Sequence, residues 1–329
     1  MSALQNKTRG KNMKYINEFR DGDSIRGIFL CKQKNSAVTK NGKAYDNVIL
    51  QDKTGTIECK IWDPNSMGIN EFEVLDYVEI RGEVSSYNGA LQMSIKNVRV
   101  AQEGEYNPID YLPSSSKDIE EMYAELLKLV DSIKNEYLHQ LLVLIFKNDE
   151  KLIKEFKIHS AAKSVHHGFM GGLLEHTLSV TKLCDYYSTA YPILNRDLLL
   201  TAAMLHDIGK VYELSSFPQN DYTDPGQLLG HIVMGYELIG NKILEIEGFP
   251  VKLGRELKHC ILAHHGELEY GSPKKPALPE AFALNLADNT DAKMETITEI
   301  VNQRPADGSE WFGYNRFLES NIRKASIED

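Results

Sequence analysis

A histidine and an aspartate stand next to each other near the end of an apolar stretch, at His206 and Asp207. The stretch, residues 198–208, predicts a helix that Gly209 helps to terminate. A neutral imidazole nitrogen and an anionic carboxylate oxygen are both ligands that a divalent metal ion accepts. Because such pairs are common by chance, this one gains weight only from further candidates along the chain, which are His176, His231, His264, His265 and Asp288.

Each further candidate lies in or beside a segment that predicts a helix. His176 follows two glycines that can start one, and His231 follows a glycine at the start of an apolar run. His264 and His265 end another run, and His264 is the better candidate because neighbouring helical residues point about 100° apart. Asp288 stands among apolar residues, where a carboxylate needs a partner. For any one histidine taken alone, a hydrogen-bonded core residue is the simpler explanation.

A ligand set of nitrogen and oxygen favours Mn²⁺, Co²⁺, Fe²⁺ or Mg²⁺ over a zinc site built on thiolates. Two such ions suit phosphodiester hydrolysis, because they lower the pKa of water and offset the charge that grows on phosphorus and the leaving oxygen. Lys210 would add a positive charge near the phosphate, or is an exposed cation at a helix end. His166 and His167, before a glycine-rich turn, are expected to bind substrate phosphate or to face solvent.

Composition indicates where such a protein works. The four cysteines lie far apart and form no C-x-x-C pair, which favours a reducing compartment, so we expect a cytoplasmic protein. No apolar run approaches the length of a membrane span. Residues 1–12 lack the apolar segment of a secretory signal, and we expect them to be disordered or to be an addition ahead of a natural start at Met13.

The first third of the chain predicts strands at residues 24–33, 45–51, 56–62, 77–86 and 91–100, all rich in β-branched and aromatic side chains. Turn signals lie at 52–55 and at 87–89, the second with the Asn-Gly of a tight hairpin. Five strands with a turn or short helix after the third, here at 63–71, are typical of an OB-fold barrel.

The remaining chain predicts helices. Residues 107–116 carry two prolines and a serine run, as linkers do, and helical periodicity dominates after them. The predicted fold class is therefore multidomain β + α, with an N-terminal five-stranded OB-fold barrel and a C-terminal all-α helical bundle. The expected boundaries are residues 13–106 for the barrel, 107–116 for the linker and 117–329 for the helical domain.

The charge pattern bears on nucleic-acid binding. A net charge of −10 argues against a protein that coats nucleic acid through bulk charge. Residues 26–60 nevertheless carry seven basic and three acidic side chains, and OB barrels bind single strands through a basic groove and stacked aromatic rings. The candidates for that face are Arg26, Phe29, Lys32, Lys34, Lys43, Tyr45, Lys60, Trp62, Arg81 and Tyr87. The alternative is that Phe29 and Trp62 fill the barrel and that the lysines only keep the surface soluble.

The order His … His-Asp … His … His-His … Asp, with Gly209-Lys210 behind the pair, resembles the HD superfamily of metal-dependent phosphohydrolases. The resemblance implies a first metal ion and a second ion bridged to it by Asp207, with Asp207 and Lys210 as catalytic candidates. The first ion would be held by His176, His206, Asp207 and Asp288, and the second by His231, His264 and His265. Residues 46–62 likewise resemble nucleic-acid-binding OB domains.

The two domains in this order resemble the YhaM-type 3′→5′ exoribonucleases of Gram-positive bacteria, whose motifs look like residues 165–177 and 205–210 here. The resemblance implies two divalent ions per chain, Mn²⁺ foremost. It also implies that single-stranded RNA, and by extension single-stranded DNA, is degraded to nucleoside 5′-monophosphates. The residues by themselves support a metal phosphoesterase joined to a single-strand-binding domain, whereas the polarity and the RNA preference come from the resemblance.

Two other functions are open at this point. An HD-type nucleotidase or cyclic-nucleotide phosphodiesterase would use the same ions on a small substrate, and the OB domain argues against it. A non-enzymatic replication factor that binds single-stranded nucleic acid would leave the metal site vestigial, and the intact ligand series argues against that. We expect no membrane partner, and a homo-oligomer is open.

Overall fold

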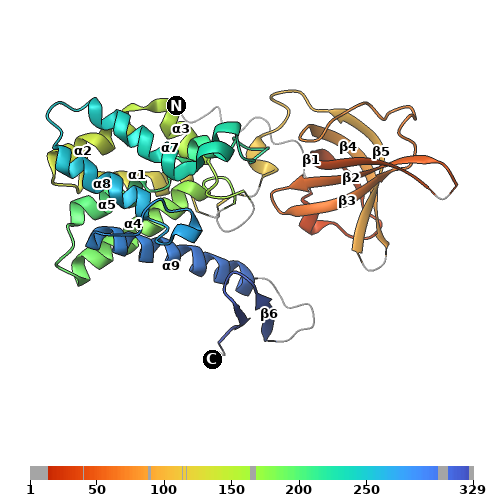
Figure 1. Ribbon diagram of the computed structural model, residues 1–329. Helices are drawn as coiled ribbons and strands as arrows, with labels where there is room; N and C mark the ends of the chain where they lie inside the picture. Colours follow the sequence, from red (N-terminus) through yellow and green to blue (C-terminus); the bar gives the residue numbers. More distant parts are fainter. Residues whose placement is uncertain are drawn as a thin grey trace. The chain divides into compact units, whose positions relative to one another are not determined.

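The computed structural model describes residues 14–39, 41–87, 90–112, 114–115, 117–163, 168–302 and 310–325. The chain divides into two compact units, Met1–Ser114 and Ser115–Asp329. The first unit is built of strands and the second mainly of helices (Figure 1). This confirms the predicted fold class.

The first unit is a closed barrel of five strands, β1 (Ser24–Val38), β2 (Ala44–Asp52), β3 (Gly55–Ile61), β4 (Tyr77–Tyr87) and β5 (Ala90–Val100). Their order around the barrel is β1-β2-β3-β5-β4, in which β3 and β5 pair in parallel and the other neighbours pair antiparallel. Inward-facing side chains fill the core, among them Phe29, Val48, Leu50, Ile61, Val78 and Met93.

Residues 63–71, where the sequence allowed a short helix, form turns. The reason lies in their pairing with β5: Val98 donates its backbone N–H to Gly68 O over 2.9 Å, and Asn70 donates to Val98 O over 3.0 Å. Ile69 forms a parallel bridge with the same Val98. A backbone tied to a strand in this way cannot also make the i to i−4 bonds of a helix.

An aromatic group holds the chain that follows β5 against the barrel. The ring of Tyr106 stacks on Tyr77 with 3.9 Å between centroids, and Tyr111 meets Tyr77 edge-on at 5.3 Å. The side-chain amide of Gln51 donates to the backbone oxygen of Tyr111 over 3.1 Å. The short 3₁₀ helix η2 (Pro108–Asp110) lies between the two tyrosines.

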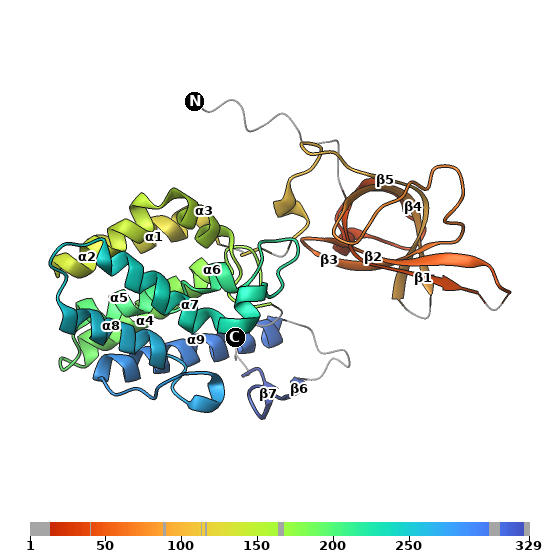
Figure 2. The same ribbon diagram turned by 45° about the horizontal axis from the view of Figure 1, so that its top comes forward.

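The second unit contains the helices α1 (Ile119–Asp131), α2 (Glu136–Val143), α3 (Glu150–Ile158), α4 (Gly172–Ala190), α5 (Arg196–Leu205), α6 (Lys210–Glu213), α7 (Asp224–Leu244), α8 (Val251–Ala263) and α9 (Pro279–Asn302). Polar side chains cap several of their starts, and each accepts a hydrogen bond from the first turn: Asp118, Asn135, Asp149, Asn195 and Thr223. Helix α4 packs against α5 and α9, while α8 packs against α5, α7 and α9 (Figure 2).

Two strands follow the helices, β6 (Trp311–Asn315) and β7 (Ser320–Arg323), and they pair as an antiparallel hairpin. From the sequence, helices were expected throughout this region. Both strands are short, and none of their side chains is buried, so the alternation that marks a strand in a sequence is missing. Among the residues that the structure describes, no helix is long and apolar enough to cross a membrane.

Two glycines shape the place where α6 meets α7. Gly230 has φ +72° and ψ 157°, which breaks α7 and makes His231 the first residue of its second segment. A Cβ atom at Gly209 would lie 2.0 Å from the backbone oxygen of His231 and 2.7 Å from the nitrogen of Gly235. The close approach of the two helices therefore requires glycine at position 209.

We expect Gly209→Ala to destabilise the helical unit by about 1–3 kcal/mol, because the added methyl group meets backbone that cannot move alone. Thermal unfolding of the full chain measures the effect. Gly240→Ala is the matched control in α7, since its Cβ would meet only the flexible end of Lys258, at 2.8 Å, and alanine favours a helix by about 1 kcal/mol. Equal melting temperatures for the two variants would contradict the packing argument.

Candidate metal centre

The loop that follows α5 carries His206 and Asp207 into the middle of the helical unit, where both are buried. Four further helices bring ligand candidates to the same place: α4 with His176, α7 with His231, the end of α8 with His264, and α9 with Asp288. The structure thus gathers side chains that are far apart in the sequence around one carboxylate.

One group of donor atoms surrounds Asp207 Oδ2. This oxygen lies 3.4 Å from His176 Nε2 and 3.4 Å from His206 Nε2. The two nitrogens are 3.2 Å apart. Asp288 Oδ1 lies 3.1 Å from His176 Nε2 and 3.8 Å from His206 Nε2. We call His176, His206, Asp207 and Asp288 the first cluster.

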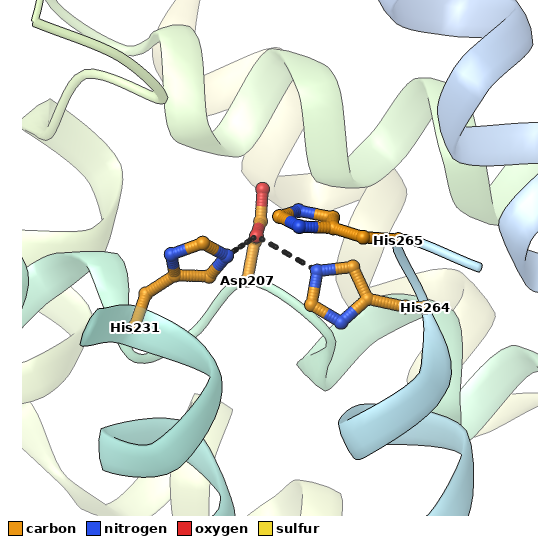
Figure 3. A group of neighbouring side chains, drawn as sticks. All are labelled: Asp207, His231, His264 and His265. Atoms are coloured by element: carbon orange, nitrogen blue, oxygen red, sulfur yellow. Dashed lines mark ion pairs between the residues drawn. The ribbon is translucent and has the colours of Figure 1, made fainter. Parts of the chain in front are cut away.

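A second group surrounds the other oxygen of the same carboxylate. Asp207 Oδ1 lies 3.4 Å from His231 Nε2 and 3.6 Å from His264 Nε2. His265 joins them, and the four ligand atoms all lie within 4.8 Å of one another. Figure 3 shows the three imidazole rings placed around the carboxylate. We call Asp207, His231, His264 and His265 the second cluster, and Asp207 belongs to both.

Each of the five histidines in the two clusters is oriented by a hydrogen bond at Nδ1. The acceptor is a backbone oxygen for His206 (Ala203 O, 2.8 Å), His264 (Ile261 O, 2.7 Å) and His265 (Tyr270 O, 2.8 Å). It is a carboxylate for His176 (Asp291 Oδ2, 2.7 Å) and His231 (Glu213 Oε1, 3.0 Å). A backbone oxygen can only accept, so Nδ1 carries the proton in the first three rings and leaves the Nε2 lone pair for a ligand bond. This arrangement is typical of metal-bound histidine.

Among the described residues, the buried side-chain atoms without a hydrogen-bond partner include Asp207 Oδ1, His231 Nε2 and His264 Nε2. Buried polar atoms in native proteins are nearly always satisfied, and these three converge on one point. Donor atoms 3.1–3.8 Å apart, as in both clusters, can each reach a common ion at about 2.0–2.2 Å. The residues therefore fit a divalent cation in each cluster.

The charge balance keeps the carboxylates ionised. Burial by itself would raise the pKa of Asp207, but Lys210 and His206 outweigh it and hold that pKa well below its usual value. The Lys210 ammonium lies 2.7 Å from Asp207 Oδ2, and the carboxylate raises its pKa against the opposing effect of burial. Asp288 behaves like Asp207: burial opposes ionisation, and His176 and His206 lower its pKa.

Two histidines of the second cluster are held neutral. Burial lowers the pKa of His264, although the Asp207 carboxylate works in the opposite direction. Burial, aided by the neighbouring His264, lowers the pKa of His265 to about 4. His176 differs: burial favours its neutral form, but the carboxylates of Asp207, Asp288 and Asp291 outweigh burial and raise its pKa.

Asp291 and Glu213 were not among the site residues predicted from the sequence. Asp291 follows Asp288 by three residues on α9, and Glu213 follows Lys210 by three residues on α6. Both therefore lie one helical turn after a predicted site residue, on the same helix face. An acidic residue at that spacing is the signal that would have found them. His166 and His167 lie outside the described residues.

On the barrel, three predicted binding residues lie together. Tyr45 on β2 and Trp62 just after β3 have ring centroids 5.6 Å apart, and Trp62 is 50% exposed. Lys60 places its ammonium 5.5 Å from the Tyr45 ring centroid, where it also contacts Asn47 and Glu58. Lys43 is exposed in the loop before β2. The face of strands 2 and 3 and the loop between strands 1 and 2 are where OB folds bind oligonucleotides.

The other candidates on the barrel lie elsewhere. Phe29 is fully buried in the core, so it cannot stack on a base, and that expectation is wrong. Arg26 pairs with Glu79, and Arg81 is exposed opposite Arg26 on the β1–β4 surface. Lys34 donates to Phe72 O over 2.8 Å. Lys32 is exposed at a bulge of β1, and Tyr87 is exposed at the end of β4.

We expect Asp291→Asn to weaken metal binding by about 10–100-fold while leaving the fold intact, because it removes the charge that orients His176. Calorimetric titration of the full chain with Mn²⁺ measures the affinity. Glu256→Gln is the control, since this carboxylate pairs only loosely with exposed Lys252, at 3.8 Å. An unchanged Mn²⁺ titration for Asp291→Asn would show that Asp291 has no part in the centre.

Comparison with known proteins agrees with this geometry. Residues 173–293 match the family model of the HD domain, and this range holds both clusters together with Lys210, Glu213 and Asp291. Residues 31–101 match an OB-fold nucleic acid binding domain. Among solved structures, the second OB-fold domain of replication protein A from Methanococcus maripaludis is 21% identical and has a TM-score of 0.23; the match covers 28% of this chain and 96% of that domain. The chain thus joins an OB-fold nucleic-acid-binding domain to an HD domain, the domain of metal-dependent phosphohydrolases.

Proposed function

We propose that the protein is a metal-dependent 3′→5′ exoribonuclease that removes nucleoside 5′-monophosphates from single-stranded RNA. One observation carries the hydrolytic part: the two oxygens of buried Asp207 each face a separate set of imidazole nitrogens, at 3.4–3.6 Å. A pair of ions bridged by one carboxylate is the arrangement that two-metal phosphodiesterases use. The direction of attack and the preference for RNA are supported by the resemblance to YhaM-type enzymes.

The residues of the two clusters and Lys210 would have different roles in such a site. Divalent cations, with Mn²⁺ the first choice, would lower the pKa of water and offset charge on the phosphoryl oxygens. Asp288, His176 and His206 would hold one cation, while the three histidines of the second cluster would hold the other. Lys210 keeps Asp207 ionised and adds one positive charge beside the place where a phosphate would lie.

The barrel supports a polymeric substrate. The half-exposed Trp62 ring, the neighbouring Tyr45 ring and the Lys60 ammonium lie on one outer face. Aromatic rings beside a cation bind single strands without reading sequence, because every base has a face that can stack. A free nucleotide or a cyclic nucleotide would need no such surface, so this face favours a nuclease over a nucleotidase.

The activity test uses single-stranded RNA labelled at either end, incubated with the full chain and Mn²⁺. We expect the 3′ label to appear at once in a mononucleotide and the 5′ label to shorten stepwise. Asp207→Ala should abolish both signals, because both clusters lose their shared ligand. The control is Asp131→Ala, which removes an exposed carboxylate of the same unit. Early release of the 5′ label, or cleavage of cyclic nucleotides alone, would overturn the proposal.

The binding face is tested in the Asp207→Ala background, which preserves the RNA. Trp62→Ala and Tyr45→Ala should each weaken RNA binding by about 1–3 kcal/mol at any salt concentration. Lys43→Ala should flatten the dependence of log affinity on log salt by roughly one unit. Arg81→Ala, on the β1–β4 surface, is the comparison, and thermal melting of each variant controls for unfolding. If only Arg81→Ala weakened binding, the strand would follow the other surface of the barrel.

A further inference from the structure

A cavity of about 340 Å³ adjoins the metal centre and reaches residues that have no role in it. His231 and Lys210 line it from the metal centre, while Ala161, Leu214 and Tyr222 are among the other residues that line it. Its volume lies in the range of small-molecule sites, which is about 300–1,000 Å³. A ligand that fills the cavity would therefore touch the metal centre and the Tyr222 ring at once.

The backbone at Tyr222 is fixed by pairing with neighbouring residues. Tyr222 forms an antiparallel bridge with Leu214, and Ser215 N donates to Asp221 O over 2.7 Å. Thr223 N donates to Glu213 O over 2.9 Å, and the Glu213 carboxylate in turn accepts from both the backbone N–H and the ring of His231. A short chain of hydrogen bonds thus fixes Tyr222 relative to a metal ligand, while its side chain stays 45% exposed.

The chemistry of the walls suits a nucleotide. Ala161 and Leu214 are buried apolar residues, and Tyr222 offers an aromatic face on which a base can stack. The Lys210 ammonium and the cation sites provide positive charge for a phosphate. The cavity would therefore accommodate a ligand that carries both an anionic group and a flat apolar group.

The polar groups near Tyr222 are already hydrogen-bonded within the chain. The Asn220 amide donates to Ala162 O and Lys163 O, both over 3.1 Å, and its oxygen accepts from Ser160. Asp221 Oδ1 accepts from Tyr222 N over 2.7 Å and from Lys163 over 2.6 Å. Asn220 and Asp221 are not among the described residues that line the cavity, whereas Lys163 is, with its ammonium 6.0 Å from the Tyr222 ring centroid. The Tyr222 ring is therefore the lining group on which a base can stack.

We infer that this cavity holds the terminal nucleotide of the strand, with its base stacked on Tyr222 and its phosphate at the metal centre. The inference rests on the proposed function and adds to it a contact with the terminal base, which the Tyr222 ring supplies. All four bases are accepted, because stacking does not depend on the pattern of donors and acceptors.

The test compares RNA that ends in a normal 3′ nucleotide with RNA that ends in an abasic one. Tyr222→Leu removes the aromatic face and keeps the apolar bulk, while Tyr222→Phe keeps the ring. Tyr222→Leu should lower kcat/KM about tenfold on the normal end and leave the abasic end unchanged. Tyr222→Phe should act like the parent, and the parent should treat the four terminal bases within a few-fold of one another.

A binding measurement separates this inference from the proposed function. With Mn²⁺ present, Tyr222→Leu should bind adenosine 5′-monophosphate about tenfold more weakly than the parent and ribose 5-phosphate equally well. If RNA is degraded but Tyr222→Leu treats both ends alike, the inference is overturned and the nuclease stands. If RNA is not degraded but Tyr222→Leu weakens only the binding of adenosine 5′-monophosphate, the proposed nuclease activity is overturned and the cavity is still a nucleotide site.

Discussion

The helical unit depends on a single buried carboxylate that is shared by two sets of histidines. Asp207 Oδ2 lies beside Nε2 of His176 and His206, and Oδ1 lies beside Nε2 of His231 and His264. An isolated buried charge would cost several kcal/mol, so the fold must supply positive or cation-binding partners on both sides. Lys210 supplies one such charge directly, at 2.7 Å. The helices α4, α7 and α9, and the residues just after α5 and α8, bring these partners to Asp207.

The histidines of the two clusters are oriented in two ways, by backbone oxygens or by carboxylates. His206 and His264 follow the last residues of α5 and α8, where backbone oxygens lack helical partners. Each ring takes such an oxygen three residues back. His176 lies inside α4, and His231 is the first residue after the break of α7 at Gly230. These two rings are oriented by carboxylates from other helices, Asp291 and Glu213.

The elements and the candidate ligands could be predicted from the sequence more readily than the carboxylates that orient the histidines. The strands of the barrel and the helices that carry the two clusters are long enough for their periodicity to be read, and the candidate ligands are recognised by their order along the chain rather than one by one. Asp291 and Glu213 contact histidines of other helices, and in the sequence only their spacing of three residues after Asp288 and Lys210 indicates them. On β3, the buried residues Ile57, Cys59 and Ile61 place Trp62 outward by simple alternation. Phe29, Leu30 and Cys31 are all buried just before a bulge, so alternation could not assign Phe29 to the core.

The donor atoms of the metal centre are nitrogen and oxygen, and the four cysteines lie apart from it, buried in the cores of the two units. Burial raises the pKa of the Cys31 thiol to about 11 and that of Cys260 to about 12, and it raises those of Cys59 and Cys184 as well. Thiols react with oxidants as thiolates. The two clusters contain no thiolate, so they lack the side chain that peroxide oxidises most readily in proteins.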